Sequence, residues 1–283
     1  SVSRDWYPEP WMRTSCDIDV LVEEARLDEG VAALTQGLNF RYEEKGDHDV
    51  SLLSPNNVHL ELHYDTVQQR YADDRRRAVL AGVWEDAMPK AADGYHRCMS
   101  DAMFYYYHMA HMAKHFETGG CGIRPFMDIW IMNHRLDFDP EKRRQLLERG
   151  DLLRFAQAAE QLAEHWFSDA PADDMTAQLE EYILRGGVFG NDENRAAVGQ
   201  AKMGGKLRYV LLRRVFMPYD YLKAEYPILQ RHKWLTPVYQ VVRWFRMVFK
   251  GQTRRTLTEL RSNTASTKEE RAEAQALLDH LGL

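Results

Sequence analysis

Two acidic residues near the start of the chain have the spacing of a metal site. Asp17 and Asp19 are separated by one apolar residue, and alternate residues of a strand lie on one face of a sheet. On a strand both carboxylates project the same way, while Ile18, Val20 and Val22 face the core. Like charges side by side are unfavourable unless a cation such as Mg²⁺ neutralises them. The alternative is a solvated strand end whose two acids bind nothing.

A second segment, 58–65, alternates strictly between apolar and ionisable residues. Glu61 lies on its ionisable face and is a third carboxylate for a strand beside the first one. Three carboxylates can hold two metal ions about 3.5–4 Å apart, as in phosphoryl and nucleotidyl transfer. A solvent-facing sheet surface is the plain alternative, and a Zn²⁺ site is another. The ionisable face carries His59, Glu61, His63 and Asp65.

Short strands and turns surround these acids, and helices follow. Gly46-Asp47 and Pro55-Asn56-Asn57 are turn sequences between short runs of β-formers, which predicts an antiparallel meander. The fold class we expect is α+β: a small mixed β-sheet core with flanking helices, followed by a mainly helical region. Strands are expected at 17–22, 41–44, 50–54 and 58–64; helices at 23–36, 70–87, 94–117, 125–134, 140–167, 175–184, from Thr236-Pro237 onward and within 262–283; and irregular chain at 217–237.

Composition excludes several classes of protein. The chain has 283 residues, 45% of them hydrophobic and 28% charged, which is ordinary for a globular protein. The sequence contains no run of about 18 apolar residues, so no membrane-spanning helix is predicted. Three cysteines without metal-like spacing indicate reduced thiols and a cytoplasmic location. The net charge of −6 argues against a general nucleic-acid binder, so no nucleic-acid partner is expected.

These residues carry a resemblance to a known superfamily. The segment from Arg13 to Val22 resembles the R-x-x-x-D-h-D-h-h-V motif of nucleotidyltransferases related to DNA polymerase beta, where h is hydrophobic. The strand around Glu61 resembles the one that carries the third acid. More narrowly, residues 1–135 resemble the bacterial group labelled uncharacterised nucleotidyltransferases. The narrower likeness rests on Tyr7-Pro8 before Arg13, on His108, His111 and His115 in one helix, and on Arg124 with Asp128.

The resemblance implies an activity and a set of catalytic residues. Asp17, Asp19 and Glu61 would be both the catalytic residues and the ligands of two Mg²⁺ ions. A nucleoside triphosphate such as ATP would donate a nucleoside monophosphate to a hydroxyl or phosphate acceptor. The sequence leaves open which nucleotide is used, and whether the acceptor is a small molecule, a glycan precursor or a protein.

The resemblance also implies nucleotide-binding residues. Arg13, His111 and His115 are expected to contact the nucleotide, although a surface charge and a polar helix face are the plain alternatives. The superfamily has a Gly-Ser turn upstream of the paired acids that holds the triphosphate. Ser1 lies about where the Ser of that turn falls, and we expect the preceding strand and Gly to be missing. Activity of this chain is therefore left open.

The charge of the chain is unevenly distributed. Residues 202–261 carry fourteen Lys or Arg and three acids, a local charge of +11, which suggests contact with something acidic. We expect a catalytic domain at 1–95, a helical domain at 96–200 and a basic helical segment at 201–283. Within the basic segment 201–283, residues 236–250 are expected to form a basic amphipathic helix that either docks on the same protein or lies on an anionic membrane. The membrane alternative accompanies a second hypothesis: a catalytically inactive nucleotide-binding or scaffold module, for which the family resemblance implies a membrane-peripheral place in surface polysaccharide assembly.

Overall fold

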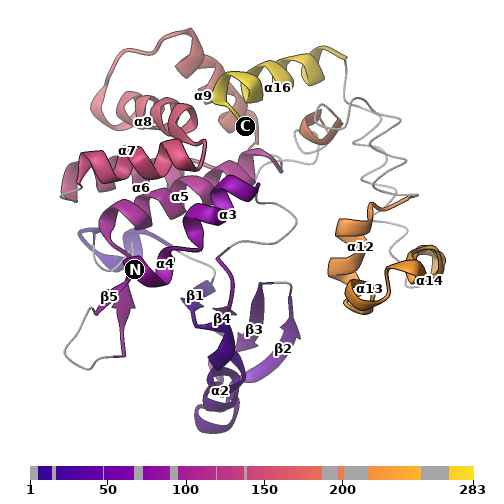
Figure 1. Ribbon diagram of the computed structural model, residues 1–283. Coiled ribbons are helices and arrows are strands. Elements are labelled where there is room, and N and C mark those ends of the chain that lie inside the picture. The colour runs from indigo at the N-terminus through magenta and orange to yellow at the C-terminus, as the bar shows by residue number, and fades with distance from the viewer. Residues whose placement is uncertain are drawn as a thin grey trace. The chain divides into compact units, whose positions relative to one another are not determined.

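The structure is a computed structural model in which the chain forms two compact units, 1–87 and 88–283 (Figure 1). The first unit holds a four-stranded sheet, and helices dominate the second. The predicted α+β class is confirmed. The structure describes residues 6–14, 17–46, 48–66, 73–89, 95–118, 120–136, 139–186, 197–200, 216–249 and 268–283.

The sheet places the acidic residues of two strands side by side. Its strand order is β1-β4-β3-β2. The last three strands form the predicted antiparallel meander, and β1 pairs with β4 in parallel. In that register Asp19 stands opposite Glu61, and Leu21 opposite His63. The strands are β1 (Asp17–Leu21), β2 (Arg41–Lys45), β3 (Asp49–Leu53) and β4 (His59–His63).

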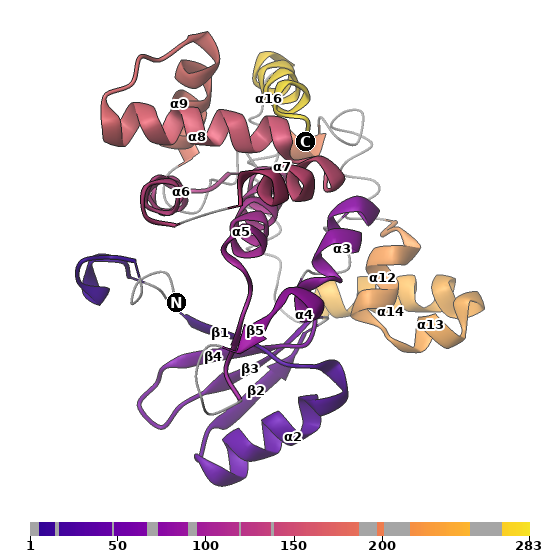
Figure 2. The ribbon, with the colours of Figure 1, turned by 60° about the vertical axis from the view of Figure 1, so that its left-hand side comes forward.

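One helix covers one face of this sheet. Helix α2 (Leu27–Ala32) lies along the strands (Figure 2), between a 3-10 turn at Glu24–Arg26 and a π turn at Ala33–Gly37. A Cβ atom at Gly30 would lie 3.0 Å from a methyl group of Leu62, so glycine permits this close approach. The buried cluster beneath the helix is Leu27, Val50, Leu52 and Leu62.

The edge strand β1 is less covered than its sequence predicts. Ile18 is 51% exposed and Val20 is 39% exposed, so the prediction that both face a core is wrong. Their side chains share a face with Leu60 and Leu62, because paired residues of adjacent strands point the same way. Helix α2 packs over the neighbouring strand β4 instead. Val22, just past the strand, does pack against the cluster as predicted.

Two predicted helices are interrupted after the sheet. The helix expected over 70–87 is seen as α3 (Asp74–Leu80) and α4 (Val83–Asp86). The helix expected from residue 94 starts only at Asp101, because Ser100 caps it by accepting a hydrogen bond from the backbone N–H of Met103. The preceding residues pair instead as a short hairpin, β5 (Met88–Pro89) with β6 (Arg97–Cys98).

The helical unit has a core of aromatic and methionine side chains. Helix α8 contacts α6, α9 and α16, and α5 contacts α7. The single helix expected over 140–167 divides at Gly150, and Asp151 adopts a positive φ of 55°. The helices are α5 (Asp101–Phe116), α6 (Arg124–Arg135), α7 (Pro140–Arg149), α8 (Leu153–Ser168), α9 (Asp174–Gly186) and α16 (Lys268–Leu281). Fully buried side chains include Tyr105, Tyr106, Phe116, Phe126, Met132 and Phe155.

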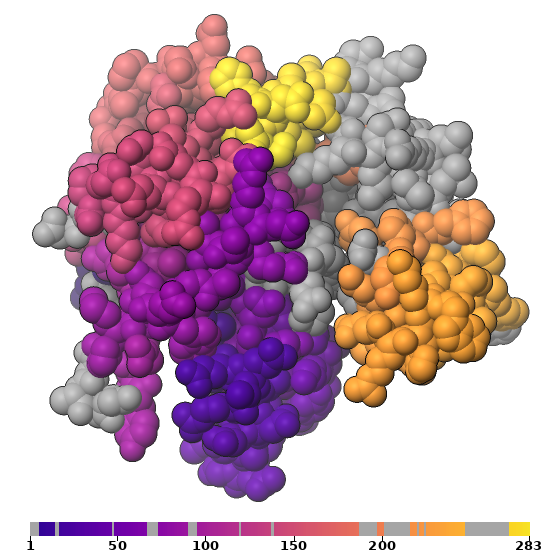
Figure 3. All heavy atoms as spheres, in the orientation of Figure 1, coloured from indigo at the N-terminus to yellow at the C-terminus, as the bar shows by residue number. Residues whose placement is uncertain are grey.

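The segment expected to be irregular, 217–237, contains short helices. Pro218 and Pro227 each precede a helix, because a fixed φ suits the position before or at the first turn. The four short elements pack on one another (Figure 3, orange). No helix in the described part of the chain is both long and apolar enough to cross a membrane. The elements are α12 (Tyr219–Glu225), α13 (Ile228–Arg231), a 3-10 turn (Lys233–Leu235) and α14 (Thr236–Phe249).

Candidate metal centre

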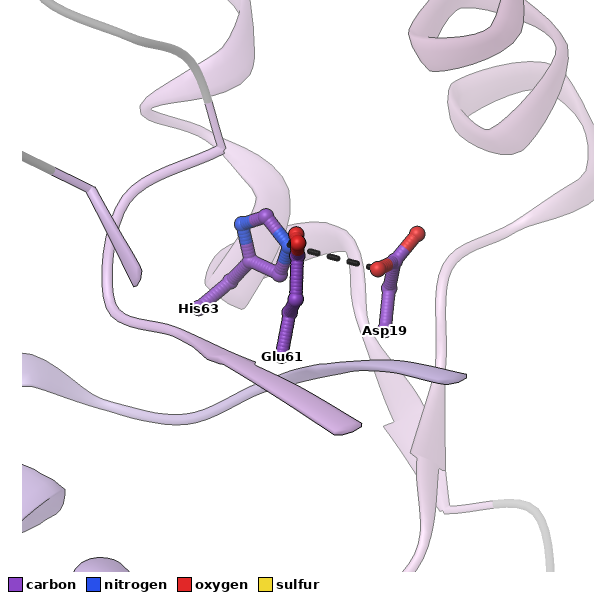
Figure 4. A group of neighbouring side chains, drawn as sticks. All are labelled: Asp19, Glu61 and His63. Carbon is purple, nitrogen blue, oxygen red and sulfur yellow. Dashed lines mark ion pairs between the residues drawn. The ribbon is translucent and has the colours of Figure 1, made fainter. Parts of the chain in front are cut away.

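Three potential metal ligands converge on the face of the sheet opposite α2. Asp19 comes from β1, and Glu61 and His63 come from β4. One ligand atom from each lies within 4.8 Å of the other two. Figure 4 shows their side chains pointing into the same space. The parallel register of β1 and β4 and the two-residue period of a strand bring them together.

His63 contributes a buried nitrogen atom without a well-directed hydrogen bond. Its Nε2 atom is inaccessible to solvent. It lies 3.4 Å from Oδ1 of Asp19 and 3.3 Å from Oε2 of Glu61, which are ion-pair contacts. Burial lowers the pKa of His63, but the neighbouring carboxylates, led by Asp19, outweigh burial and raise the pKa overall.

Glu61 is held in an environment that disfavours its charge. Burial is the largest cause that raises its pKa, followed by the negative charges of Asp49 and Asp19. His63 opposes these effects without cancelling them. A cation among these oxygens would remove the repulsion, so the cluster has the electrostatic character of a metal site.

The surrounding polar residues orient one another. Nδ1 of His48 lies 2.9 Å from Oδ1 of Asp49, and the rings of His48 and His63 meet edge to face at 5.1 Å. His59 is engaged elsewhere, because its Nδ1 lies 3.5 Å from Oε2 of Glu43. The alternative of a Zn²⁺ site that joins His59 to His63 therefore finds no support in this geometry.

The other residues predicted for the catalytic centre occupy different positions. Asp17 is exposed at the start of β1, opposite His59, and lies outside the 4.8 Å cluster. Its charge still contributes to the raised pKa of Glu61. The Arg13 guanidinium donates a hydrogen bond to the carbonyl of Thr14 at 2.7 Å. Ser1 lies outside the described residues.

Sequence reasoning left His63 out of the catalytic set. Its position on the ionisable face of 58–65 was a usable signal, since residues 61 and 63 share that face. The parallel register with β1 turns this shared face into contact with Asp19.

The predicted histidine pair lies on α5. The Nε2 atoms of His111 and His115 are 3.3 Å apart, and Tyr107 stacks on His111 at 6.2 Å. Burial, and then the charge of Lys114, lower the pKa of His115. His108 has a different environment, because its Nε2 contacts the carbonyl oxygen of Pro125 at 3.0 Å. A nucleotide-binding role for the pair remains a prediction.

Comparison with known proteins supplies an independent finding. A family model described as uncharacterised nucleotidyltransferase matches residues 1–168. That span includes the whole Asp19, Glu61 and His63 cluster and helix α5. No curated protein and no solved structure matches the chain. The chain therefore belongs to the family of uncharacterised nucleotidyltransferases, whose description points to nucleotidyl transfer in general.

Proposed function

We propose that this protein transfers a nucleoside monophosphate from a nucleoside triphosphate to a hydroxyl or phosphate acceptor, with a divalent cation. The observation that carries the proposal is that two carboxylates and an imidazole converge within 4.8 Å on two paired strands. The chain that contains them belongs to a family described as nucleotidyltransferases. Nucleotidyl transfer depends on positioning and on neutralising charge, and this cluster is suited to both tasks.

The residues of the cluster fit a divalent cation. Carboxylate oxygens and imidazole nitrogens are common ligands of such ions. The buried Nε2 of His63 lacks a well-directed hydrogen-bond partner, and a metal ion would complete its coordination. Asp19, Glu61 and His63 would hold one ion, and Asp17 would complete a second site, as in the predicted pair of Mg²⁺ ions.

The reaction forms one bond and breaks one. The acceptor oxygen bonds to the α-phosphorus, and the bond from that phosphorus to the oxygen bridging to the β-phosphate breaks, which releases pyrophosphate. A bound cation supplies neutralisation of the phosphate charge. Glu61 would accept the proton that the acceptor hydroxyl loses.

Nucleotide contacts complete the proposal. Arg13 would bind phosphate oxygens, because a guanidinium donates paired hydrogen bonds to them. His111 and His115 would contact the nucleotide from helix α5, and Ser1 would donate a hydrogen bond to the triphosphate. The acceptor is a small molecule, a glycan precursor or a protein, and ATP is the first triphosphate to test.

Label transfer from the α-phosphate tests the enzymatic function. Each triphosphate, labelled at the α-position, is incubated with the protein, a divalent cation and a cell extract as the source of acceptor. We expect labelled product and pyrophosphate from the parent, and neither from Asp19→Asn. Glu44→Gln is the matched control, because Glu44 is an exposed acid on β2 of the same sheet. Full activity in Asp19→Asn would contradict the proposal. Nucleotide binding without transfer would favour the scaffold hypothesis.

A second candidate function, membrane contact, is favoured by the surface of α14. This helix buries two polar residues, Gln240 and Arg243, and exposes its apolar arc. Gln240 donates a hydrogen bond to the carbonyl of Met217. Phe245 is 61% exposed, and Trp234 just before the helix is 74% exposed. An exposed apolar arc beside basic residues is typical of helices that lie on anionic membranes.

Sedimentation with anionic vesicles tests this contact. The parent is expected to sediment with vesicles containing phosphatidylglycerol, and Phe245→Glu is expected to remain in solution. Leu184→Glu is the control, because Leu184 is a comparably exposed apolar residue on helix α9. A parent that stays in solution, or a Phe245→Glu variant that still sediments, would contradict membrane contact.

A further inference from the structure

We infer that His63 is a direct ligand of the cation and that the site consequently selects Mn²⁺ over Mg²⁺. The inference rests on the proposed function for its consequence in catalysis. The metal preference itself follows from the ligand set of the cluster and can be measured without any reaction.

The first observation is the position of the imidazole nitrogen. Nε2 of His63 lies 3.3 Å from Oε2 of Glu61 and 3.4 Å from Oδ1 of Asp19. Two ligands about 2.1–2.2 Å from one ion and at adjacent corners of its coordination sphere are roughly 3.0–3.5 Å apart. The nitrogen therefore already stands where an adjacent ligand would stand.

The second observation is the state of that nitrogen in the protein. Nε2 is buried, and the two carboxylate oxygens of Asp19 and Glu61 lie within ion-pair distance of it. The side chain of His63 is 14% exposed, whereas that of Asp19 is 55% exposed. The imidazole is thus fixed in the floor of the cluster, and the carboxylate of Asp19 remains accessible to solvent and ligands.

The chemistry of the ligands decides the metal. Mg²⁺ prefers oxygen ligands in a near-ideal octahedron and gives up its water reluctantly. Imidazole shifts preference toward first-row transition ions, while carboxylates and phosphates still favour ions that accept oxygen. Mn²⁺ satisfies both conditions. The expectation of Mg²⁺ from the sequence was based on the carboxylates of Asp17, Asp19 and Glu61 alone, without the imidazole of His63.

The chain offers a matched control for the imidazole. His59 lies on the same strand and the same face as His63, but it pairs with Glu43 and stands outside the cluster. A substitution at His59 removes an imidazole of the same strand without removing a ligand. Gln is the replacement at both positions, because it keeps a polar side chain and offers oxygen in place of nitrogen.

Electron paramagnetic resonance tests the inference on the full chain without nucleotide. Loss of the free Mn²⁺ signal gives its affinity, and competition gives the affinity for Mg²⁺. We expect the parent to bind Mn²⁺ at least about tenfold more tightly than Mg²⁺, and His63→Gln to lose most of that ratio, since even outer-shell partners change affinity about 10–100-fold. His59→Gln should keep the parent ratio. Equal affinities in the parent, or an unchanged ratio in His63→Gln, would overturn the inference.

A spectroscopic signature makes the test independent of the variant's folding. Electron spin echo modulation of the bound Mn²⁺ should contain the coupling of a directly bound histidine nitrogen in the parent and in His59→Gln. Absence of that coupling in the parent would overturn the inference. Metal-dependent nucleotide binding without nitrogen coupling would refute this ligand assignment and leave the proposed function intact. Nitrogen coupling without any nucleotide binding would support the ligand assignment of His63 and contradict the proposed function.

Discussion

Replacing Glu61 with Gln should stabilise the metal-free protein at neutral pH. The carboxylate oxygens of Asp19 and Glu61 lie no more than 4.8 Å apart. Coulomb's law gives a repulsion of about 1 kcal/mol at that distance in water, and about 3.5 kcal/mol at an effective dielectric constant of about 20. Because the side chains are 55% and 36% exposed, screening favours the lower value. We therefore expect Glu61→Gln to raise the free energy of unfolding by about 1 kcal/mol.

The pH dependence of this gain follows from the pKa of Glu61. The pKa is raised above its ordinary value of 4.5 by burial, Asp49 and Asp19. The folded protein therefore holds the Glu61 proton more tightly than the unfolded chain does. The cost of ionising Glu61 is absent below pH 4.5, grows as the pH rises through the folded-state pKa, and is complete above it. The stability difference between Glu61→Gln and the parent should follow the same course.

Urea-induced unfolding in the presence of a chelator measures this difference. We expect a clear gain for Glu61→Gln near about pH 8 that shrinks toward about pH 5. Added Mn²⁺ should stabilise the parent by mass action and have much less effect on the variant. Glu44→Gln, on the same sheet, should change neither quantity. A Glu61→Gln variant that is no more stable than the parent at the higher pH would refute the repulsion.

Three further results are expected from the helical unit. Because burial and Lys114 lower the pKa of His115, its imidazole should titrate below 6.5 in NMR, and an ordinary value would contradict its environment. Burial raises the pKa of Cys121 to about 12, so mapped alkylation of the native protein should modify the less buried Cys98 before Cys121; faster reaction of the buried Cys121 thiol would be the contrary result. A Cβ atom at Gly150 would lie 2.0 Å from the hydroxyl oxygen of the buried Tyr106. Gly150→Ala should therefore lower the free energy of unfolding in urea by about 1–3 kcal/mol. An unchanged unfolding midpoint would refute the clash.

Alternation in sequence predicted the sheet and part of the metal centre. Because side chains alternate between the two faces of a strand, the sequence predicted that Asp19 and Glu61 lie on the ionisable faces of their strands. Placing both strands in one sheet then predicted that the two carboxylates lie close together. The register between strands is set by long-range pairing, which no local pattern encodes. That register, with Leu21 opposite His63, brings the imidazole into the cluster.

The errors have a common physical origin. Apolar periodicity identifies which residues share a face, but not whether another element covers that face. Ile18 and Val20 share the face of buried leucines, yet they lie on the edge strand. Their expected core contact depended on neighbours that tertiary structure alone decides.

Nucleotide binding measured with and without metal tests the central proposal most directly. Isothermal titration of the four triphosphates into the parent should show binding that requires Mn²⁺ or Mg²⁺ and is lost in Asp19→Asn, because that variant removes the negative charge of a carboxylate ligand while keeping the size of the side chain. Glu44→Gln should bind as the parent does. Binding that is equally strong without metal, or that survives in Asp19→Asn, would contradict a nucleotidyltransferase centre built on Asp19, Glu61 and His63.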